Sequence, residues 1–110
     1  MAEASNKKAL YIIVNIGFAD EIAEIMREEG AGGATIINAR GAGAVHRSIL
    51  GITIDTEKEI ILSVIDEEIG DKIISAIRQK AGQGTPANSI CFTMPVDKTV
   101  MTNTSVPVKG

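Results

Sequence analysis

The chain has 110 residues and a formal net charge of −3, from 11 lysine and arginine residues against 14 aspartate and glutamate residues. This length favours one domain, and the acidic balance argues against bulk attraction to nucleic acid or to an anionic membrane. The single cysteine, Cys91, excludes an internal disulfide framework and favours a reducing compartment, so we expect a cytoplasmic protein. No apolar stretch is long enough to span a membrane, and no membrane insertion is expected.

The first half of the chain predicts a strand, a helix and a second strand. Residues 9–15 form an apolar, β-branched run of strand type. Residues 20–29 carry apolar side chains at helical spacing, with Asp20 as an N-cap or first-turn acid and Gly30 in the place of a C′ glycine. The second strand is expected at residues 35–40.

The second half of the chain repeats this alternation after a long connection. In chain order we expect a mixed connection at 41–57 with an extended piece at 50–54, a strand at 60–65, a helix at 66–80, a loop rich in Gly and Pro at 81–89, and a strand at 89–94. Residues 1–7 and 101–110 are expected to be flexible tails of a single domain spanning residues 1–110.

The order β-α-β-β-α-β predicts an α+β fold, a ferredoxin-like βαββαβ sandwich of a four-stranded antiparallel sheet and two helices. Two helices cover only one face of such a sheet. In the strands at 9–15 and 60–65, however, successive side chains are apolar on both faces. A monomer would leave the second face in water as an exposed apolar patch, so we expect oligomerisation to bury it.

Two glycine-containing segments are candidates for contact with a ligand. In "NARGAG", Arg40 is followed by Gly41 and Gly43, and successive amides in such a turn can bind an anion. Taken alone, the residues favour a plain turn, because no helix follows to add its N-terminus. The loop "GQGTPANS" at 82–89 is the second candidate, and an ordinary helix-to-strand connection is its other interpretation.

The residues that commonly carry catalysis or metals do not form a recognisable set. Cys91 lies in an apolar strand and is interpreted as a buried small hydrophobe. His46 is the only histidine, and no spacing of cysteines or carboxylates completes a metal site around it. We therefore expect neither a metal site nor an enzyme.

On this fold, the two glycine segments resemble those of the nitrogen-regulatory P-II signal proteins. "GAGGATIINARGAG" at 30–43 is similar in spacing to the family segment "G-x-x-G-M-T-V-x-x-V-K-G-F-G", which leads into the flexible T-loop. "QGTPANSICFT" at 83–93 has the length and position of the family's B-loop, and the resemblance covers about residues 9–100. It implies a homotrimer that binds ATP or ADP in clefts between subunits. It also implies a T-loop that grips a target such as a membrane transporter or a metabolic enzyme.

Carried over by position, the resemblance implies two sets of functional residues. The nucleotide-binding set, in which Lys98 and Arg40 are substitute phosphate-binding cations, is Thr35, Arg40, Gly41, Ala42, Gly43, Gly84, Thr85, Ala87, Asn88, Ser89 and Lys98. The partner-binding loop is Val45, His46, Arg47 and Ser48.

The chain also departs from the family pattern. The B-loop glycines of the family fall on Ala87 and Ser89, and its lysine falls on Ile90. The late arginine pair falls on Met101 and Asn103, and the shortened T-loop lacks a tyrosine for nucleotidylation. We therefore expect a divergent P-II-like protein in which nothing requires Mg and which does not sense 2-oxoglutarate in the usual way.

The leading hypothesis is a sensor of adenylate energy state in which ligand binding orders residues 41–57. One alternative is a P-II-like or metal-tolerance-like trimer that binds AMP or another small ligand. Another is an enzyme of acylphosphatase type, although the first turn, "NIGFADE", lacks the arginine this needs. An RNA-binding module would need exposed aromatics on the middle strands and a basic face, and the sequence indicates neither.

Overall fold

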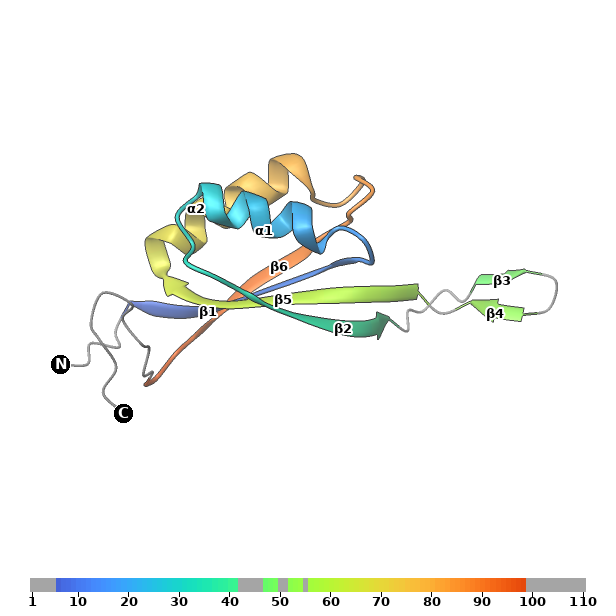
Figure 1. Cartoon of the computed structure of the whole chain (residues 1–110), viewed down its shortest axis with the longest axis horizontal. Helices are drawn as coiled ribbons and strands as arrows, with labels where there is room; N and C mark the ends of the chain where they lie inside the picture. Colours follow the sequence, from blue (N-terminus) through green and yellow to red (C-terminus); the bar gives the residue numbers. More distant parts are fainter. Residues whose placement is uncertain (1–5, 42–46, 50–51, 55, 99–110) are drawn as a thin grey trace.

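The structure, a computed structural model, describes residues 6–41, 47–49, 52–54 and 56–98. In chain order its elements are β1 (Lys7–Asn15), α1 (Ala19–Glu28), β2 (Thr35–Gly41), β3 (Arg47–Ile49), β4 (Ile52–Ile54), β5 (Thr56–Asp66), α2 (Glu67–Lys80) and β6 (Ile90–Pro95). Strands β2, β5, β1 and β6 form one antiparallel sheet in that order, and both helices lie on one face of it (Figure 1). The predicted α+β ferredoxin-like fold is confirmed.

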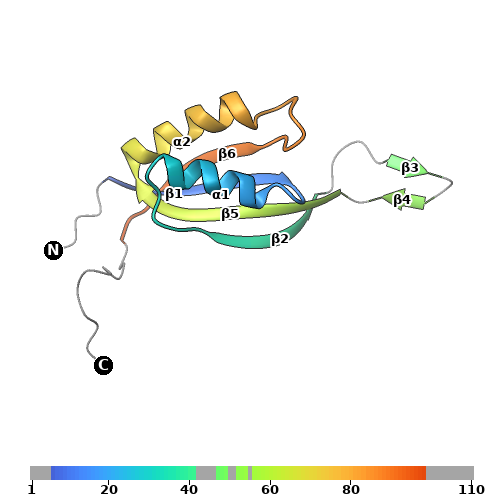
Figure 2. The same cartoon turned by 45° about the horizontal axis from the view of Figure 1, so that its top comes forward.

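The connection between β2 and β5 contains a small hairpin that the sequence analysis predicted only in part. The extended piece expected at 50–54 corresponds to β4, and it pairs with β3, which was not predicted. The hairpin extends from one end of the sheet (Figure 2). Most of the tails expected at 1–7 and 101–110 lies outside the described residues, but Lys7 already belongs to β1 and pairs with Asp66.

Strand β5 begins at Thr56, four residues before the strand predicted at 60–65. The extra residues are polar, so they carry no hydrophobic signal. They are held as a strand by pairing with β2, in which Ala39 lies opposite Lys58 and Gly41 lies opposite Thr56. Backbone hydrogen bonds of the ladder, and not side-chain burial, therefore extend this strand.

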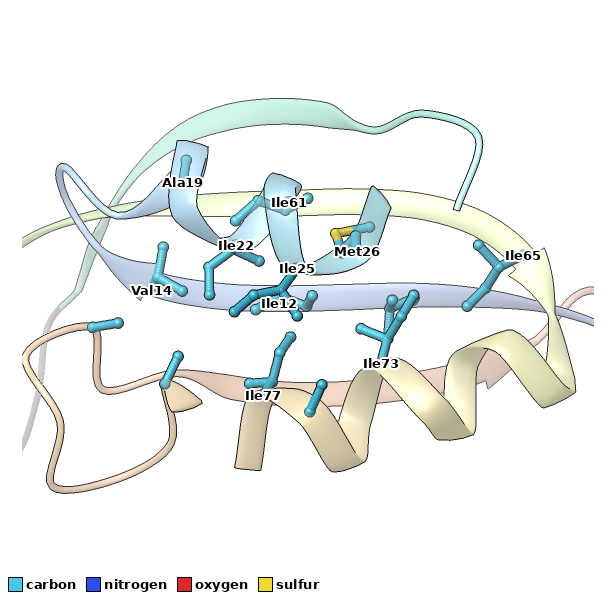
Figure 3. Packing of buried hydrophobic residues seen from close by; sticks show 14 residues of the cluster. Ile12, Val14, Ala19, Ile22, Ile25, Met26, Ile61, Ile65, Ile73 and Ile77 are labelled. Carbon is cyan, nitrogen blue, oxygen red and sulfur yellow. The ribbon is translucent and has the colours of Figure 1, made fainter. Parts of the chain in front are cut away.

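The core lies between the sheet and the two helices (Figure 3). Alternate residues of the central strands point toward the helices, and residues at helical spacing point back toward the sheet. The largest side chains with less than 2% exposure are Leu10, Ile12, Val14, Ile22, Met26, Ile61, Ile73 and Ile77. The first-turn acid expected at Asp20 and the left-handed glycine expected at Gly30, with φ of 109°, are both confirmed.

The opposite face of the sheet, called the open face below, is largely apolar across its middle on all four strands. From the register, and because Leu10, Ile12 and Ile61 point to the helices, this middle part comprises Ala9, Tyr11, Ile13, Thr35, Ile37, Ala39, Ile60, Leu62, Val64, Ile90, Phe92 and Met94. The ends of the two central strands place polar residues on the same face, Lys7 and Asp66 at one end and Asn15 and Lys58 at the other. One row across the strands is Ile37, Ile60, Ile13 and Ile90, whose two outer members are 44% and 54% exposed. The prediction of a sheet that is apolar on both faces is confirmed.

The open face also carries two aromatic side chains. Tyr11 on β1 stacks on Phe92 of β6, with ring centroids 5.2 Å apart and planes within 10°. Tyr11, on the central strand β1, is half-buried, and Phe92, which is 41% exposed, is on β6, so the exposed aromatic ring is on an edge strand and not on a middle one. The register places two lysines on this face, but the Lys7 amine is paired with Asp66 and the Lys58 amine donates to Asn15, so the face carries no cluster of basic residues of the kind that RNA binding needs.

Candidate ligand site at one end of the sheet

The two glycine segments lie at the same end of the sheet but at opposite edges. Of the "NARGAG" segment the structure describes Asn38 to Gly41, which end β2 at one edge of the sheet, and loop 82–89 enters β6, the strand at the other edge. Both lie at the end from which the β3–β4 hairpin extends (Figures 1 and 2). Three strand spacings separate the two edges, which is about 14 Å. Within one chain, the two predicted ligand-binding segments are therefore separated by the width of the sheet.

Loop 82–89 is held in shape by its own hydrogen bonds. The Thr85 hydroxyl donates to the Gly82 carbonyl at 2.7 Å and accepts from the Asn88 amide at 3.3 Å. Gly84 has φ of 90° and Asn88 has φ of 48°, which glycine and asparagine adopt at lower cost than other residues. The conformation of the loop is therefore stabilised by contacts within the loop itself.

The side chains of loop 82–89 divide into an outward and an inward set. Gly84 and Asn88 are exposed and Thr85 is half-buried. Ala87 and Ser89 are only 2% and 7% exposed. The Ser89 hydroxyl is buried, with no hydrogen-bond partner among the described residues. A ligand on the outer surface of this loop would therefore meet Ala87 and Ser89 through their backbone.

The other predicted nucleotide-binding residues are spread along the sheet. Arg40 and Gly41 are at the end of β2 nearest the hairpin, opposite Glu57 and Thr56. Thr35 begins the same strand and is on the open face about 20 Å away, six residues along an extended chain. Lys98 follows Pro95 at the opposite end of the sheet from loop 82–89. The fold of one chain therefore does not bring Lys98 to that loop.

The remaining predicted residues belong to the connection between β2 and β5. Ala42, Gly43, Val45 and His46 lie outside the described residues. Arg47 and Ser48 are in β3, where Arg47 pairs with Ile54 and Ser48 with Thr53. The predicted partner-binding loop thus includes two of the three residues of β3.

Three polar residues at this end of the sheet were missed by the sequence analysis. Asn15 accepts a 2.7 Å hydrogen bond from the Lys58 amine and donates one of 2.9 Å to the Pro86 carbonyl. Glu59 accepts from the backbone amides of Gly17 and Ala19. Polar residues at strand ends are common, and these contacts join positions about 40 to 70 apart in sequence. No local pattern could therefore have predicted them.

A cavity of about 400 Å³ lies between α2 and the start of β6. It is lined by Ile74, Ile77, Arg78, Gly82, Gln83, Ser89, Ile90 and Cys91. Burial raises the pKa of the Cys91 thiol from 9.0 to about 11. The thiolate is the reactive form of cysteine, so this shift favours the predicted interpretation of Cys91 as part of the packing.

Cys91 is therefore expected to react slowly with a disulfide reagent such as DTNB. A pKa that is higher by about two lowers the thiolate fraction at pH 8 about 100-fold, and the rate should rise about tenfold per pH unit up to pH 10. Because the pKa is higher in the folded state, the stability that this thiol contributes is full below pH 9 and is lost as the pH rises toward 11. A rate that levels off near pH 9 would show that the thiol is not desolvated.

The part of the chain that the structure describes holds no group of three or more His, Cys, Asp or Glu side chains placed to hold a metal ion. Its longer helix, α2, has 14 residues, fewer than the roughly 20 that a bilayer requires, and neither helix there could cross a membrane.

The comparison with protein families agrees with this fold. The model of the family "Nitrogen regulatory protein P-II" matches residues 7–105, nearly the whole chain. The chain belongs to this family. The match includes β2, both halves of the candidate site and the sheet with its open face. No curated protein sequence matches this P-II chain.

Solved structures of P-II proteins share the fold. A PII-like signaling protein from Thermus thermophilus superposes with a TM-score of 0.63 at 18% identity, over 82% of this chain and 85% of that one. GlnK from B. subtilis gives 0.66 at 15% identity over 84% and 87%, and its complex with ATP gives 0.66 at 13% identity over 84% and 85%. At these identities the likeness shows the fold alone.

Proposed function

We propose that this P-II family member is a homotrimeric regulator that binds ATP or ADP between its subunits. It senses the adenylate energy state in the cytoplasm and regulates a partner, a membrane transporter or a metabolic enzyme, through the T-loop formed by residues 41–57. No chemical step is part of this function. The B. subtilis GlnK–ATP complex is a nucleotide-bound protein of the same fold, which supports the choice of ligand.

The observation that carries the proposal is the separation of the two half-sites. Arg40 and Gly41 are at one edge of the sheet and loop 82–89 is at the other, both at the same end. If the β2 edge of one copy meets the β6 edge of the next, the two halves face each other across the boundary. The open face, which is apolar and half-exposed in the single chain, supplies the surface that such an assembly would bury.

AMP is the second candidate ligand, and Ile90 favours it. Family members have a phosphate-binding lysine at this position. Here an isoleucine stands there, 54% exposed at the start of β6. An apolar side chain offers no charge to a triphosphate, so a ligand with fewer phosphates loses less at this site.

Isothermal titration calorimetry with ATP, ADP and AMP, each with and without Mg, tests the proposal. We expect micromolar binding of ATP or ADP and about tenfold weaker binding in an Arg40→Gln variant, since a charge-assisted contact to phosphate contributes about 1.5 kcal/mol. Lys72→Gln is the control, because Lys72 is exposed on α2. Absence of heat with every nucleotide would contradict the proposed function, and binding of AMP alone would favour the second candidate.

A further inference from the structure

Asn15, the last residue of β1, uses all four of its polar groups to join separate parts of the chain. Its side-chain oxygen accepts from the Lys58 amine at 2.7 Å and its side-chain nitrogen donates to the Pro86 carbonyl at 2.9 Å. Its backbone amide donates to the Ala87 carbonyl at 3.0 Å, and its carbonyl accepts from the Phe18 amide. One residue thus contacts loop 82–89 on one side and the start of β5 on the other.

Asn15 lies at the end of a central strand, between the two edges of the sheet that carry the half-sites. Asn15 and Lys58 are directly opposite each other in the β1–β5 ladder. Strand β1 is the neighbour of β6, which follows loop 82–89, and β5 is the neighbour of β2, which carries Arg40. The next residue, Ile16, donates its amide to the Glu57 carbonyl at 3.2 Å. The bonds of Asn15 therefore cross the sheet end between the two half-sites.

We infer that Asn15 is a positioning residue that transmits a change in loop 82–89 to the start of β5, where the T-loop ends. The inference rests on the proposed function, because a nucleotide on the loop is the event that would move it. A planar carboxamide donates at one corner and accepts at the other. A shift of the Pro86 carbonyl that keeps its bond to Asn15 therefore turns the amide and moves the oxygen to which Lys58 donates.

The two side-chain bonds of Asn15, one to Pro86 and one to Lys58, can be removed one at a time by substitution. In Asn15→Asp the side chain can still accept from Lys58, but it has no donor and places a charge against the Pro86 carbonyl. In Lys58→Met the bond to β5 is lost while the bond to the loop remains. Lys7→Met is the matched control, because its amine makes a 2.7 Å bond to Asp66 between the same two strands at the far end of the ladder.

The test perturbs the loop without nucleotide and reads the response at β5. Thr85→Ala removes the two hydrogen bonds that the Thr85 side chain makes within the loop. Amide hydrogen exchange at Ile16 and at Glu57 to Glu59 is then measured by NMR, with and without Thr85→Ala, in each background. With native Asn15 we expect Thr85→Ala to change exchange about threefold or more, the coupling typical of one hydrogen-bond network. In Asn15→Asp and Lys58→Met the change should shrink below about 1.5-fold.

Two results would overturn the inference. In the first, Thr85→Ala changes amide exchange at β5 equally with and without the side-chain bonds of Asn15. In the second, Lys7→Met removes this change as fully as Asn15→Asp does, which would show that any loosening of the β1–β5 ladder has the same effect. The test of Asn15 is separate from the test of the proposed function. If the protein binds nucleotide but Thr85→Ala acts on exchange at β5 independently of Asn15, only the role of Asn15 is rejected. If the effect of Thr85→Ala depends on Asn15 but no nucleotide binds, only the proposed ligand is rejected.

Discussion

Replacing Ile37 with glutamate is expected to convert the proposed trimer into monomers. Ile37 is on the open face of β2 and is 44% exposed in the single chain. Together with Ile60, Ile13 and Ile90 it forms a row of isoleucines across the sheet. If assembly buries this row, the substitution places a carboxylate inside an apolar interface.

The expected effect is large because the variant loses apolar burial and also buries a charge, and both changes weaken association. Burying the exposed half of an isoleucine contributes about 1 kcal/mol, which the variant loses. A carboxylate without a partner costs several kcal/mol when it is taken out of water. A total above about 3 kcal/mol for each interface weakens association more than about 100-fold. Sedimentation equilibrium over a range of concentrations would follow the change from three times the 11.6 kDa chain mass to one.

The neighbouring residue provides a matched control. Ile36 is 43% exposed in the same strand, but it points to the helix side because it lies opposite the buried Ile61. Ile36→Glu should therefore leave the trimer intact. If Ile37→Glu and Ile36→Glu assemble equally well, or if the native chain is monomeric at high concentration, the open face is not the interface between copies.

The strands and helices with a strong apolar pattern could be predicted from the sequence. Leu10, Ile12 and Val14 alternate with apolar residues of the other face, and this period of two is set by backbone geometry alone. No such pattern is present in Thr56 to Glu59 or in β3, because these residues are extended through backbone pairing with another strand and not through burial of apolar side chains. The fold could therefore be predicted where burial determines it, and not where ladder pairing does.

The candidate site was predictable in its parts and not in its arrangement. The two glycine segments are visible in the sequence as turns. That they lie at one end of the sheet and at opposite edges follows from the strand order, which needs the packed chain. The bonds of Asn15 and Glu59 depend on residues about 40 to 70 positions away, so their roles have no local signature.

Replacing Glu59 with alanine is expected to lower the free energy of unfolding by about 2 kcal/mol. One carboxylate oxygen of Glu59 accepts from the amide of Gly17 at 3.0 Å and from that of Ala19 at 3.2 Å. Ala19 is the first residue of α1, and no side chain of the helix's own N-terminal region caps it. Glu59 on β5 therefore acts as the cap from a different part of the chain, and its charge also favours the positive end of the helix dipole.

Chemical unfolding at one fixed protein concentration would measure the loss, because assembly makes stability depend on concentration. Glu59→Gln keeps a carbonyl acceptor without the charge and should lose about half as much. Glu28→Ala is the control, since Glu28 is exposed at the last position of α1, and it should change stability by less than about 0.5 kcal/mol. If Glu59→Ala proves as stable as Glu28→Ala, the amides of Gly17 and Ala19 are equally well solvated by water, and packing against β5 alone fixes where α1 begins.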